Sequence, residues 1–373
     1  KDTIFVTKEG FLEYATRINK KELSDLNIRL AKEDLPKKTE KFLYELGSAP
    51  FCACHAPTIL ELPDGTLLAA FFGGSSEHTP DVRIWSCRKE PGKEWSAPVQ
   101  ITKKKAGNPS LFRSFSGKLI LFDGWGGNMA TSTDEGKTWS GLRRLPGGGA
   151  EKNKPVQLED GTILAVAQEG VIASTNDGES WSKISGGAKQ GTLLKYSNNR
   201  LQMMYRVGGN GGPMGVLWSE NNGKSWSKGS VALPNNNCGL DGTTLRNGTQ
   251  AIAYNHSHRK QAGTGHKGRG FLTLAMSDDG NAWDAALIIN WTTHAEGFFQ
   301  YSYPGIIQTR DGLIHIIHTW GRITINHVVV NPKALTRVPM PNGKWPTTGP
   351  NSTEEYKKEY PNYHTPETKG LYY

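Results

Sequence analysis

A short turn recurs along this chain, and its repetition restricts the fold more than any other feature of the sequence. The turn reads TSTDEGKTWS at 131–140, ASTNDGESWS at 173–182 and WSENNGKSWS at 218–227. A Trp follows the turn Gly by three residues in each copy, and the same spacing occurs before Trp283 and, in a degenerate copy, before Trp95. A chain that repeats one unit in this way is built from neighbouring copies of a single supersecondary structure.

A second pattern alternates with the turns. It consists of two alternating apolar stretches around a short polar turn, as in LELPDGTLLAAF and VQLEDGTILAVA. The Asp-Gly pair in these two examples favours the tight primed turns of β-hairpins. The pattern occurs six times, at 60–71, 111–122, 156–167, 193–205, 243–254 and 306–317. Each repeat therefore contains a hairpin, a further strand and the Trp turn, which together make one small antiparallel sheet.

Repeated small sheets of this kind indicate a β-propeller, in which each sheet buries its faces against its neighbours and the ring closes on itself. The hairpins predict an all-β fold, a six-bladed β-propeller over 51–338. We expect residues 1–50 to pack on the propeller or complete its last blade, and 339–373 to form an extended tail. A seventh blade built from 1–50 is the alternative.

The residues of the repeated turn stabilise the fold. Its Asp or Asn accepts hydrogen bonds from the turn's own amides, its Gly adopts a left-handed conformation, and its Trp packs the turn between strands. The turn resembles the Asp-box of the sialidase superfamily of BNR-repeat proteins, and the resemblance covers roughly residues 50–330. This resemblance implies a six-bladed propeller, but not one particular chemistry, because one fold hosts many functions.

The resemblance also implies where site residues lie. Sialidases bind a sugar carboxylate with arginines, use a Tyr with a Glu partner as nucleophile, and use an Asp as acid/base. In CHAPTILELPDG, His55 stands where the first arginine is expected. In the loop GGSSEHTPDVRIW, Glu77 is the nearest match to the acid/base Asp, with His78 and Asp81 beside it. A solvated loop is the other interpretation of Glu77 and His78.

Arginines occur at the remaining carboxylate-binding positions. Arg206 in LQMMYR matches the second sialidase arginine, and Arg269 in GRGFLTLAMSDDG matches the third. Arg322 in HTWGRITINHV follows on a later strand. These side chains are candidates for binding an acidic sugar, although pairing with acidic residues near the axis would also explain them.

The nucleophile and its partner depart from the sialidase pattern. The segment FFQYSYPGIIQTRDG offers Tyr301 first and Tyr303 second as the reactive Tyr, and we expect only one of them to face the central funnel. The partner Glu falls near Gln190, which we assign to substrate binding because an amide cannot take a proton from Tyr. A standard sialidase site is therefore not predicted.

The residues that remain suit a different reaction. A lyase that cuts beside a uronate needs a cation for the carboxylate, a base for the C5 proton and an acid for the leaving oxygen. His55 suits the base, Tyr301 the acid, and Arg206 and Arg269 the cations. We therefore predict an enzyme that cleaves a glycosidic bond of an acidic oligo- or polysaccharide by β-elimination, at chain ends, as a monomer and without a cofactor.

Two alternatives stay open. A sialidase-like exo-hydrolase would use Glu77 as acid and Tyr301 as nucleophile. A non-catalytic glycan-binding propeller would explain His55 and Gln190 as marks of a lost active site, with His55 a structural hydrogen-bonding group.

Charge and hydropathy narrow the partners. The net charge of +9 favours an anionic partner, which an acidic glycan, a nucleic acid or a membrane surface could each supply. The basic run ITKKKAG has no interleaved aromatic residues, so we predict no nucleic-acid binding. No apolar run is long enough to span a bilayer, so we predict no membrane insertion.

We predict that the protein is secreted and extracellular. The first residues, KDTIFVTKEG, lack the apolar core of a signal peptide, so we expect any such peptide to have been removed. Glycosylation sequons are compatible with a secreted glycoprotein and begin at Asn247, Asn255, Asn290 and Asn351.

No metal site is predicted. Cys52 and Cys54 have a spacing that suits no usual zinc site, and the four cysteines could form at most two disulfides. His315 and His318 fall on opposite faces of a strand. The basic step KNKP at 152–155 we expect to be a solvated turn.

Overall fold

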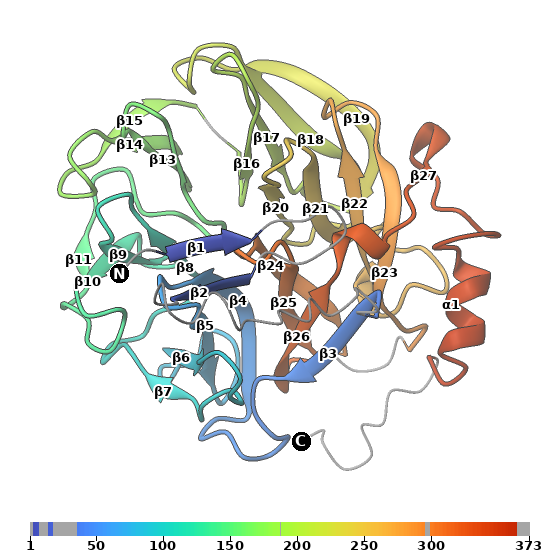
Figure 1. Cartoon of the computed structure of the whole chain (residues 1–373), viewed down its shortest axis with the longest axis horizontal. Helices are drawn as coiled ribbons and strands as arrows, with labels where there is room; N and C mark the ends of the chain where they lie inside the picture. The colour runs from blue at the N-terminus through green and yellow to red at the C-terminus, as the bar shows by residue number, and fades with distance from the viewer. Residues whose placement is uncertain (1–2, 7–13, 18–35, 187, 295–298, 364–373) are drawn as a thin grey trace.

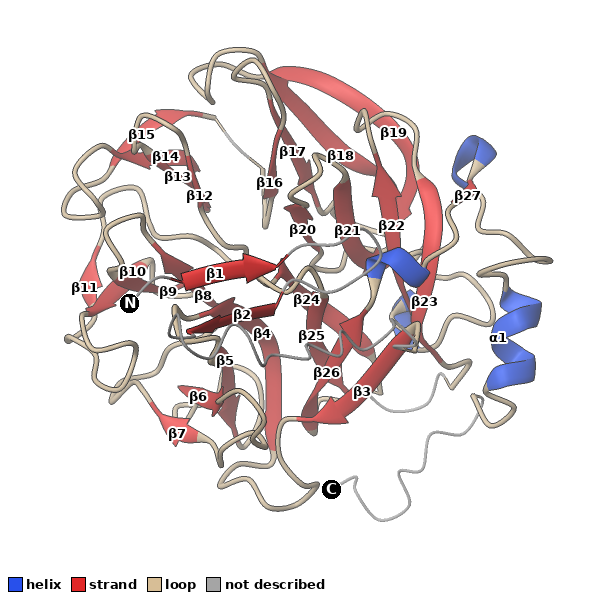
Figure 2. Ribbon diagram, in the orientation of Figure 1, coloured by secondary structure: helices blue, strands red, loops and turns tan. Residues whose placement is uncertain are grey.

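The computed structural model describes residues 3–6, 14–17, 36–186, 188–294 and 299–363 (Figure 1). Six small antiparallel sheets surround a common axis as the blades of a β-propeller, which confirms the predicted fold class. Figure 2 shows that strands make up the ring and that helix α1 (Thr353–Glu359) lies outside it.

Blades 1 to 4 each consist of four strands that follow one another in the chain. The strands are β4 (Ala53–Glu61), β5 (Leu67–Gly74), β6 (Arg83–Lys89) and β7 (Val99–Gln100) in blade 1; β8 (Pro109–Arg113), β9 (Leu119–Asp123), β10 (Asn128–Ser132) and β11 (Arg143–Arg144) in blade 2; β12 (Val156–Gln157), β13 (Ile163–Ala167), β14 (Gly170–Ser174) and β15 (Ser182–Ser185) in blade 3; and β16 (Thr192–Lys195), β17 (Leu201–Tyr205), β18 (Gly212–Ser219) and β19 (Ser227–Asn235) in blade 4.

The last two blades recruit strands from the ends of the chain. Blade 5 contains β20 (Asp241–Thr244), β21 (Gln250–Asn255), β22 (Phe271–Ser277), β23 (Asp284–Trp291) and, from the C-terminal region, β27 (Val338–Pro339). Blade 6 contains β24 (Tyr301–Gln308), β25 (Ile314–Trp320), β26 (Thr324–Val330) and, from the N-terminal region, β3 (Lys38–Phe42). Because β3 is the outermost strand of blade 6, an early segment of the chain completes the blade formed last and closes the ring.

The remaining elements are short. Strands β1 (Thr3–Val6) and β2 (Tyr14–Arg17) form a separate two-stranded sheet. The 3₁₀ helices are η1 (His266–Gly268), η2 (Pro332–Ala334) and η3 (Pro341–Gly343).

The core lies between the blades rather than in one central layer. Strands β5, β9 and β13 are buried along their whole length, because each sheet is covered by a neighbour on both faces. The rings of Phe122 in blade 2 and Trp181 after blade 3's third strand meet edge to face at 5.4 Å. The apolar alternation of the hairpins thus becomes a series of interfaces between blades.

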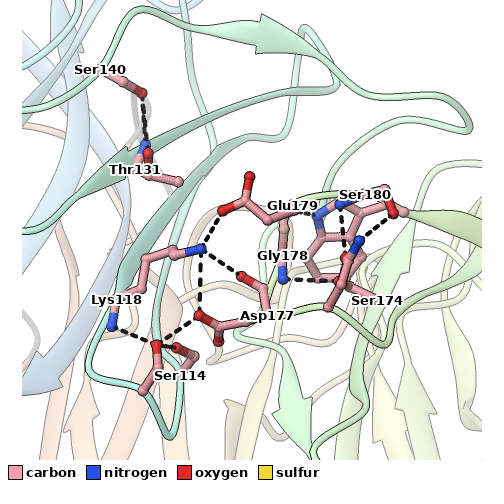
Figure 3. Close-up of polar contacts among 12 residues, drawn as sticks. Ser114, Lys118, Thr131, Ser140, Ser174, Asp177, Gly178, Glu179 and Ser180 are labelled. Carbon is pink, nitrogen blue, oxygen red and sulfur yellow. Dashed lines mark hydrogen bonds and ion pairs between the residues drawn. The ribbon is translucent and has the colours of Figure 1, made fainter.

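The repeated turn of one blade packs against the preceding blade. In blade 3 the turn residue Gly178 has φ of 80°, and the Trp181 indole N–H donates to its carbonyl at 3.1 Å. A Cβ placed on Gly178 would lie 2.5 Å from Ile120 Cδ1 in blade 2. Figure 3 shows Lys118, from the blade 2 hairpin, donating to the Asp177 carbonyl at 3.1 Å. The turn therefore has the structural role that the sequence predicts.

The first strand of each blade lines the axis, since β4, β16, β20 and β24 contact the inner strands of neighbouring blades. Because every blade begins with its inner strand and has the same antiparallel strand order, all inner strands run in the same direction along the axis. We call the end where they begin the front end and the end where their hairpin turns lie the rear end. The turns between the third and fourth strands, which include the Asp-boxes, consequently lie at the rear end.

Candidate active site

Most of the predicted site residues lie at the front end of the propeller. They occupy two kinds of position, either the start of an inner strand or the connection between a blade's second and third strands. Both kinds of position lie at the front end because adjacent strands are antiparallel. The residues placed there are His55, Glu77, Gln190, Arg206, Arg269, Tyr303 and Arg322.

Tyr303 is the centre of this cluster. Its ring centroid lies 4.2 Å from that of His55. The guanidinium carbons of Arg206 and Arg269 lie 5.9 and 5.6 Å from the Tyr303 ring. Its hydroxyl oxygen accepts a hydrogen bond of 2.5 Å from Arg206 Nη1. A phenol in contact with cations and an imidazole is a suitable proton donor or acceptor.

The structure places Tyr303 in the front cluster, rather than Tyr301, which the sequence favours, and the backbone of β24 explains the difference. Residues two apart share one face of a regular strand, but the pairing of β24 with β25 shifts register between Ser302 and Gly305. Tyr303 has φ of 53°, which turns its side chain into the cluster. Tyr301 instead packs in the core of blade 6, with its ring 5.2 Å from that of Phe299.

Buried polar groups hold this bulge in place. Lys152 Nζ donates to the Pro304 carbonyl at 2.5 Å, and the Ile306 amide donates to Asp241 at 3.0 Å. A positive φ at an aromatic residue is a strained conformation that persists only when its surroundings impose it. Lys152 and Asp241 supply these surroundings.

His55 is buried and neutral. Its Nδ1 lies 2.8 Å from the Thr319 hydroxyl, and its Nε2 is buried with no partner among the described residues. Burial is the main cause that holds the pKa of His55 well below its ordinary value, and the charges of Arg322 and Arg269 add to it. A neutral imidazole keeps one nitrogen lone pair, which is the form that a general base requires.

Arg206 and Arg269 are held by neutral oxygens. Arg206 donates to the Gln190 side-chain oxygen at 2.8 Å and to the Asn237 carbonyl at 2.8 Å. Arg269 donates to the Gln300 side-chain oxygen at 2.9 Å and to the Asn237 carbonyl at 3.3 Å. Within the described part of the chain, no carboxylate forms an ion pair with either guanidinium. Their charges are therefore oriented without being neutralised, as binding of an anion requires.

Glu77 and Arg322 form the one ion pair of this cluster within the described ranges, with Arg322 Nη1 2.6 Å from Glu77 Oε2. The Glu77 side chain keeps 32% of its exposure. His78 is more exposed, and its ring packs at a tilt against that of Trp125, with the ring centroids 4.5 Å apart. Asp81 does not reach the cluster, because it accepts hydrogen bonds from the Ser75 amide and hydroxyl at 2.7 and 2.9 Å.

Hydrogen bonds from Thr79 and Ser75 lower the pKa of Asp81 to about 2. An ionised carboxylate in this turn stabilises the loop that carries Glu77. Asp81 is thus a loop-stabilising residue in the structure rather than part of the front cluster.

Comparisons with known proteins identify the family to which this propeller belongs. The BNR repeat-like domain family matches the chain over residues 65–316. The chain belongs to this family. Its fold is similar to that of the Hadza microbial sialidase Hz136, with 16% identity, coverage of 80% of this chain and 69% of that chain, and a TM-score of 0.64. No curated protein matches the sequence.

Two further solved structures share the fold of this BNR propeller. The NanB sialidase from Streptococcus pneumoniae is 13% identical, with coverage of 86% of this chain and 73% of that chain and a TM-score of 0.59. A protein of unknown function from Dyadobacter fermentans is 15% identical, with coverage of 80% and 100% and a TM-score of 0.57. At such identities the likeness concerns the fold.

Lys152 of the BNR propeller is a buried residue of the front end that was not predicted from the sequence. The KNKP segment that we expected to be a solvated turn carries a fully buried lysine whose Nζ donates to the Leu240 carbonyl at 3.2 Å. Burial lowers the pKa of Lys152 to about 8. The available signal was position, because KNKP immediately precedes an inner strand, as Gln190 does.

Other predicted features of the BNR propeller can be located. All four cysteines are unbridged, and Cys52 is the exposed one. Of the sequon asparagines, Asn247 is exposed, whereas the other three are buried. The described residues contain no group of three or more His, Cys, Asp or Glu side chains that could hold a metal ion. No helix in the described ranges is both long and apolar enough to cross a membrane.

Proposed function

We propose that this protein is an extracellular enzyme that cleaves a glycosidic bond beside a uronate residue by β-elimination, at the ends of an acidic oligo- or polysaccharide. One observation carries the proposal. Arg206 Nη1 donates hydrogen bonds to both the Tyr303 hydroxyl oxygen and the Gln190 side-chain oxygen. Gln190 thus lies beside Tyr303 at the position where hydrolysis with a tyrosine nucleophile would need a carboxylate partner.

The cluster supplies each group that elimination needs. Arg206 and Arg269 bind the uronate carboxylate, which delocalises the negative charge that develops when C5 loses its proton. His55 accepts the C5 proton. The electron pair of the C5–H bond forms the C4–C5 double bond, the C4–O bond breaks, and Tyr303 donates its proton to the leaving oxygen.

The low basicity of His55 is compatible with this reaction. Burial is the main cause that lowers the pKa of His55, and the charges of Arg269 and Arg206 add to it. The same two arginines bind the carboxylate in the proposed reaction, which makes the C5–H more acidic. The cations thus weaken the base and activate the substrate together.

A hydrolase is the second candidate, and Glu77 favours it. Its half-buried carboxylate, 2.6 Å from Arg322, could serve as the acid while Tyr303 attacks the anomeric carbon. The fold likeness to sialidases is compatible with this reaction as well.

Two readouts on one panel of glycans test the proposal. Uronate- and sialate-bearing oligosaccharides are incubated with the protein, and near-ultraviolet absorbance and reducing ends are both recorded. Elimination produces an unsaturated uronate that absorbs, whereas hydrolysis produces reducing ends without absorbance. A glycan-binding protein without activity would produce neither, and this outcome would refute both candidates.

The matched variants are His55→Gln and His256→Gln. His256 is also a buried histidine, but its ring packs edge to face against Phe271 and Trp345, and its Nδ1 lies 2.5 Å from the Tyr254 hydroxyl. We expect His55→Gln to lower the rate by about 100-fold or more and His256→Gln to retain it. Equal loss in both variants would mean that buried imidazoles serve stability, and the assignment of His55 as base would be wrong.

A further inference from the structure

A cavity lies at the rear half of the central channel. It has a volume of about 220 Å³ and is lined by the inner strands β8, β12, β16 and β20 together with the hairpin turn after β8. Three of its lining residues are cationic, namely Arg113, Lys154 and Lys195, and none of the described residues that line it is Asp or Glu. The cavity therefore offers positive charge to a ligand that enters it from solvent.

The three cationic side chains differ in their ion-pair and hydrogen-bond partners. Lys154 pairs with Asp241 at 2.8 Å, and Lys195 donates to the Gln157 carbonyl at 3.1 Å. The Nε of Arg113 is buried and has no acceptor among the described residues. Neither Arg113 nor Lys195 forms an ion pair with a carboxylate of the described residues, whereas Lys154 does. The cavity therefore holds two cationic side chains whose charge is available to an anionic ligand.

An aromatic ring stands beside Arg113. Phe115 keeps 69% of its exposure and is one of only two exposed large apolar side chains in the described part of the chain. Its backbone amide donates to the Gln157 side-chain oxygen at 2.7 Å, which fixes the turn that carries the ring. A guanidinium and an exposed aromatic ring that line the same cavity suit a ligand that has both a carboxylate and an apolar face.

We propose that this rear cavity is a second binding site, which takes one carboxylated sugar residue. The apolar C–H face of the sugar stacks on Phe115, and its carboxylate bonds Arg113 and Lys195. The volume is below that of sites for drug-sized ligands, which limits the occupant to about one sugar unit.

The rear site is separate from the front cluster. The buried carboxylate of Asp241 lies between them, accepting hydrogen bonds from Lys154 on one side and from the Ile306 amide behind the Tyr303 bulge on the other. Thr192 also donates to Asp241, at 3.0 Å. Occupation of the rear site does not require the reaction proposed for the front end.

Amide-resolved NMR titration of the full chain tests this site. The probes are glucuronate, glucose and inorganic phosphate, and the reporters are the amides of Phe115 and Thr244 at the rear and of Gly239, which lies against Tyr303, at the front. We expect glucuronate to shift the rear amides saturably and glucose to leave them unchanged. Because the readout is binding, it is independent of any failure of the proposed reaction.

Variants identify the groups responsible. We expect Arg113→Gln to weaken glucuronate binding at the rear by about tenfold or more, as loss of a hydrogen bond to a charged group predicts, and Phe115→Ala to weaken it as well. Arg143→Gln, at an exposed position on the outer strand β11, is the matched control and retains binding.

Three outcomes would overturn the proposal. The first is shifts confined to the front amide, which would leave only the front site. The second is an equal affinity for phosphate with no effect of Phe115→Ala, which would mean an anion site without sugar recognition. The third is equal weakening by Arg113→Gln and Arg143→Gln, which would mean attraction by net charge alone.

Discussion

Replacing Tyr303 by Phe removes one oxygen atom from the centre of the front cluster and keeps the ring. The lost oxygen accepts the 2.5 Å hydrogen bond from Arg206 Nη1. Arg206 keeps its bonds to the Gln190 side chain and to both oxygens of Asn237, so the guanidinium stays in position. The variant therefore tests the chemistry of the hydroxyl with little change in structure.

The expected loss of activity can be bounded. A hydrogen bond to a charged group contributes about 1.5–3 kcal/mol, which corresponds to roughly 10- to 150-fold in rate if the hydroxyl only positions Arg206. A proton transferred by the hydroxyl contributes about 10²–10⁴-fold. We expect kcat to fall by about 100-fold or more, with a smaller change in KM, because the arginines that bind the carboxylate remain.

Tyr301→Phe is the control for Tyr303→Phe, since both tyrosines belong to β24 and are buried. The assay is the initial rate on the most active glycan, together with the thermal midpoint of each variant. We expect Tyr301→Phe to retain activity within about threefold, because its ring lies in the blade 6 core. Retained activity in Tyr303→Phe, or an equal loss in Tyr301→Phe, would refute the placement of the reactive hydroxyl at Tyr303.

Three further predictions concern stability and reactivity. Gly178→Ala should lower the free energy of unfolding by about 1–2 kcal/mol because of its left-handed φ, and by about 1–3 kcal/mol more because of contact with Ile120. Gly161 has φ of 86° and open space around it, so Gly161→Ala should lower the free energy of unfolding by the first amount only. Equal losses in the two variants, measured by urea unfolding, would contradict the inter-blade role of the turn. Cys52 should react with a thiol reagent in the native protein and the buried cysteines only after denaturation, and fast labelling of more than one thiol would contradict the packing. The free energy of unfolding should fall as pH drops from about 6.5 towards about 4. The reason is that burial lowers the pKa of several histidines in the folded state, so the unfolded chain binds more protons than the folded one in this range. A urea midpoint that stays constant over this range would contradict the burial of these histidines. These histidines are His55, His256, His315, His318 and His327.

The blades were predictable because their causes are local. A hairpin is specified by the alternation of apolar residues and by turn chemistry, and both are visible in segments such as 60–71 and 156–167. The Gly-to-Trp turn is also local, since Gly178 and Trp181 interact within one turn. Counting such units yields the number of blades, and the front placement of the site follows from the direction of the inner strands.

The composition of the front cluster was only partly predictable. The resemblance to sialidases led to Arg206, Arg269 and His55, and the structure brings these side chains together around Tyr303. The choice between Tyr301 and Tyr303 depends on a bulge whose supports are distant in the chain. One support is Lys152, which reaches the Pro304 carbonyl across 152 positions of sequence.

The sequence alone thus determined the architecture and the types of side chain that reach the front end, because repeated local patterns specify sheets and the sheets specify which ends of the strands meet. Tertiary structure decided which tyrosine joins the cluster, that Lys152 is buried rather than solvated, and that Asp81 serves its own loop. The first two outcomes depend on hydrogen bonds between blades, such as the bond from Lys152 to the Pro304 carbonyl, which form only once the ring has closed, so no short window of sequence contains both partners. The third depends on the conformation of one loop, in which Asp81 folds back on Ser75 instead of pointing to the front end.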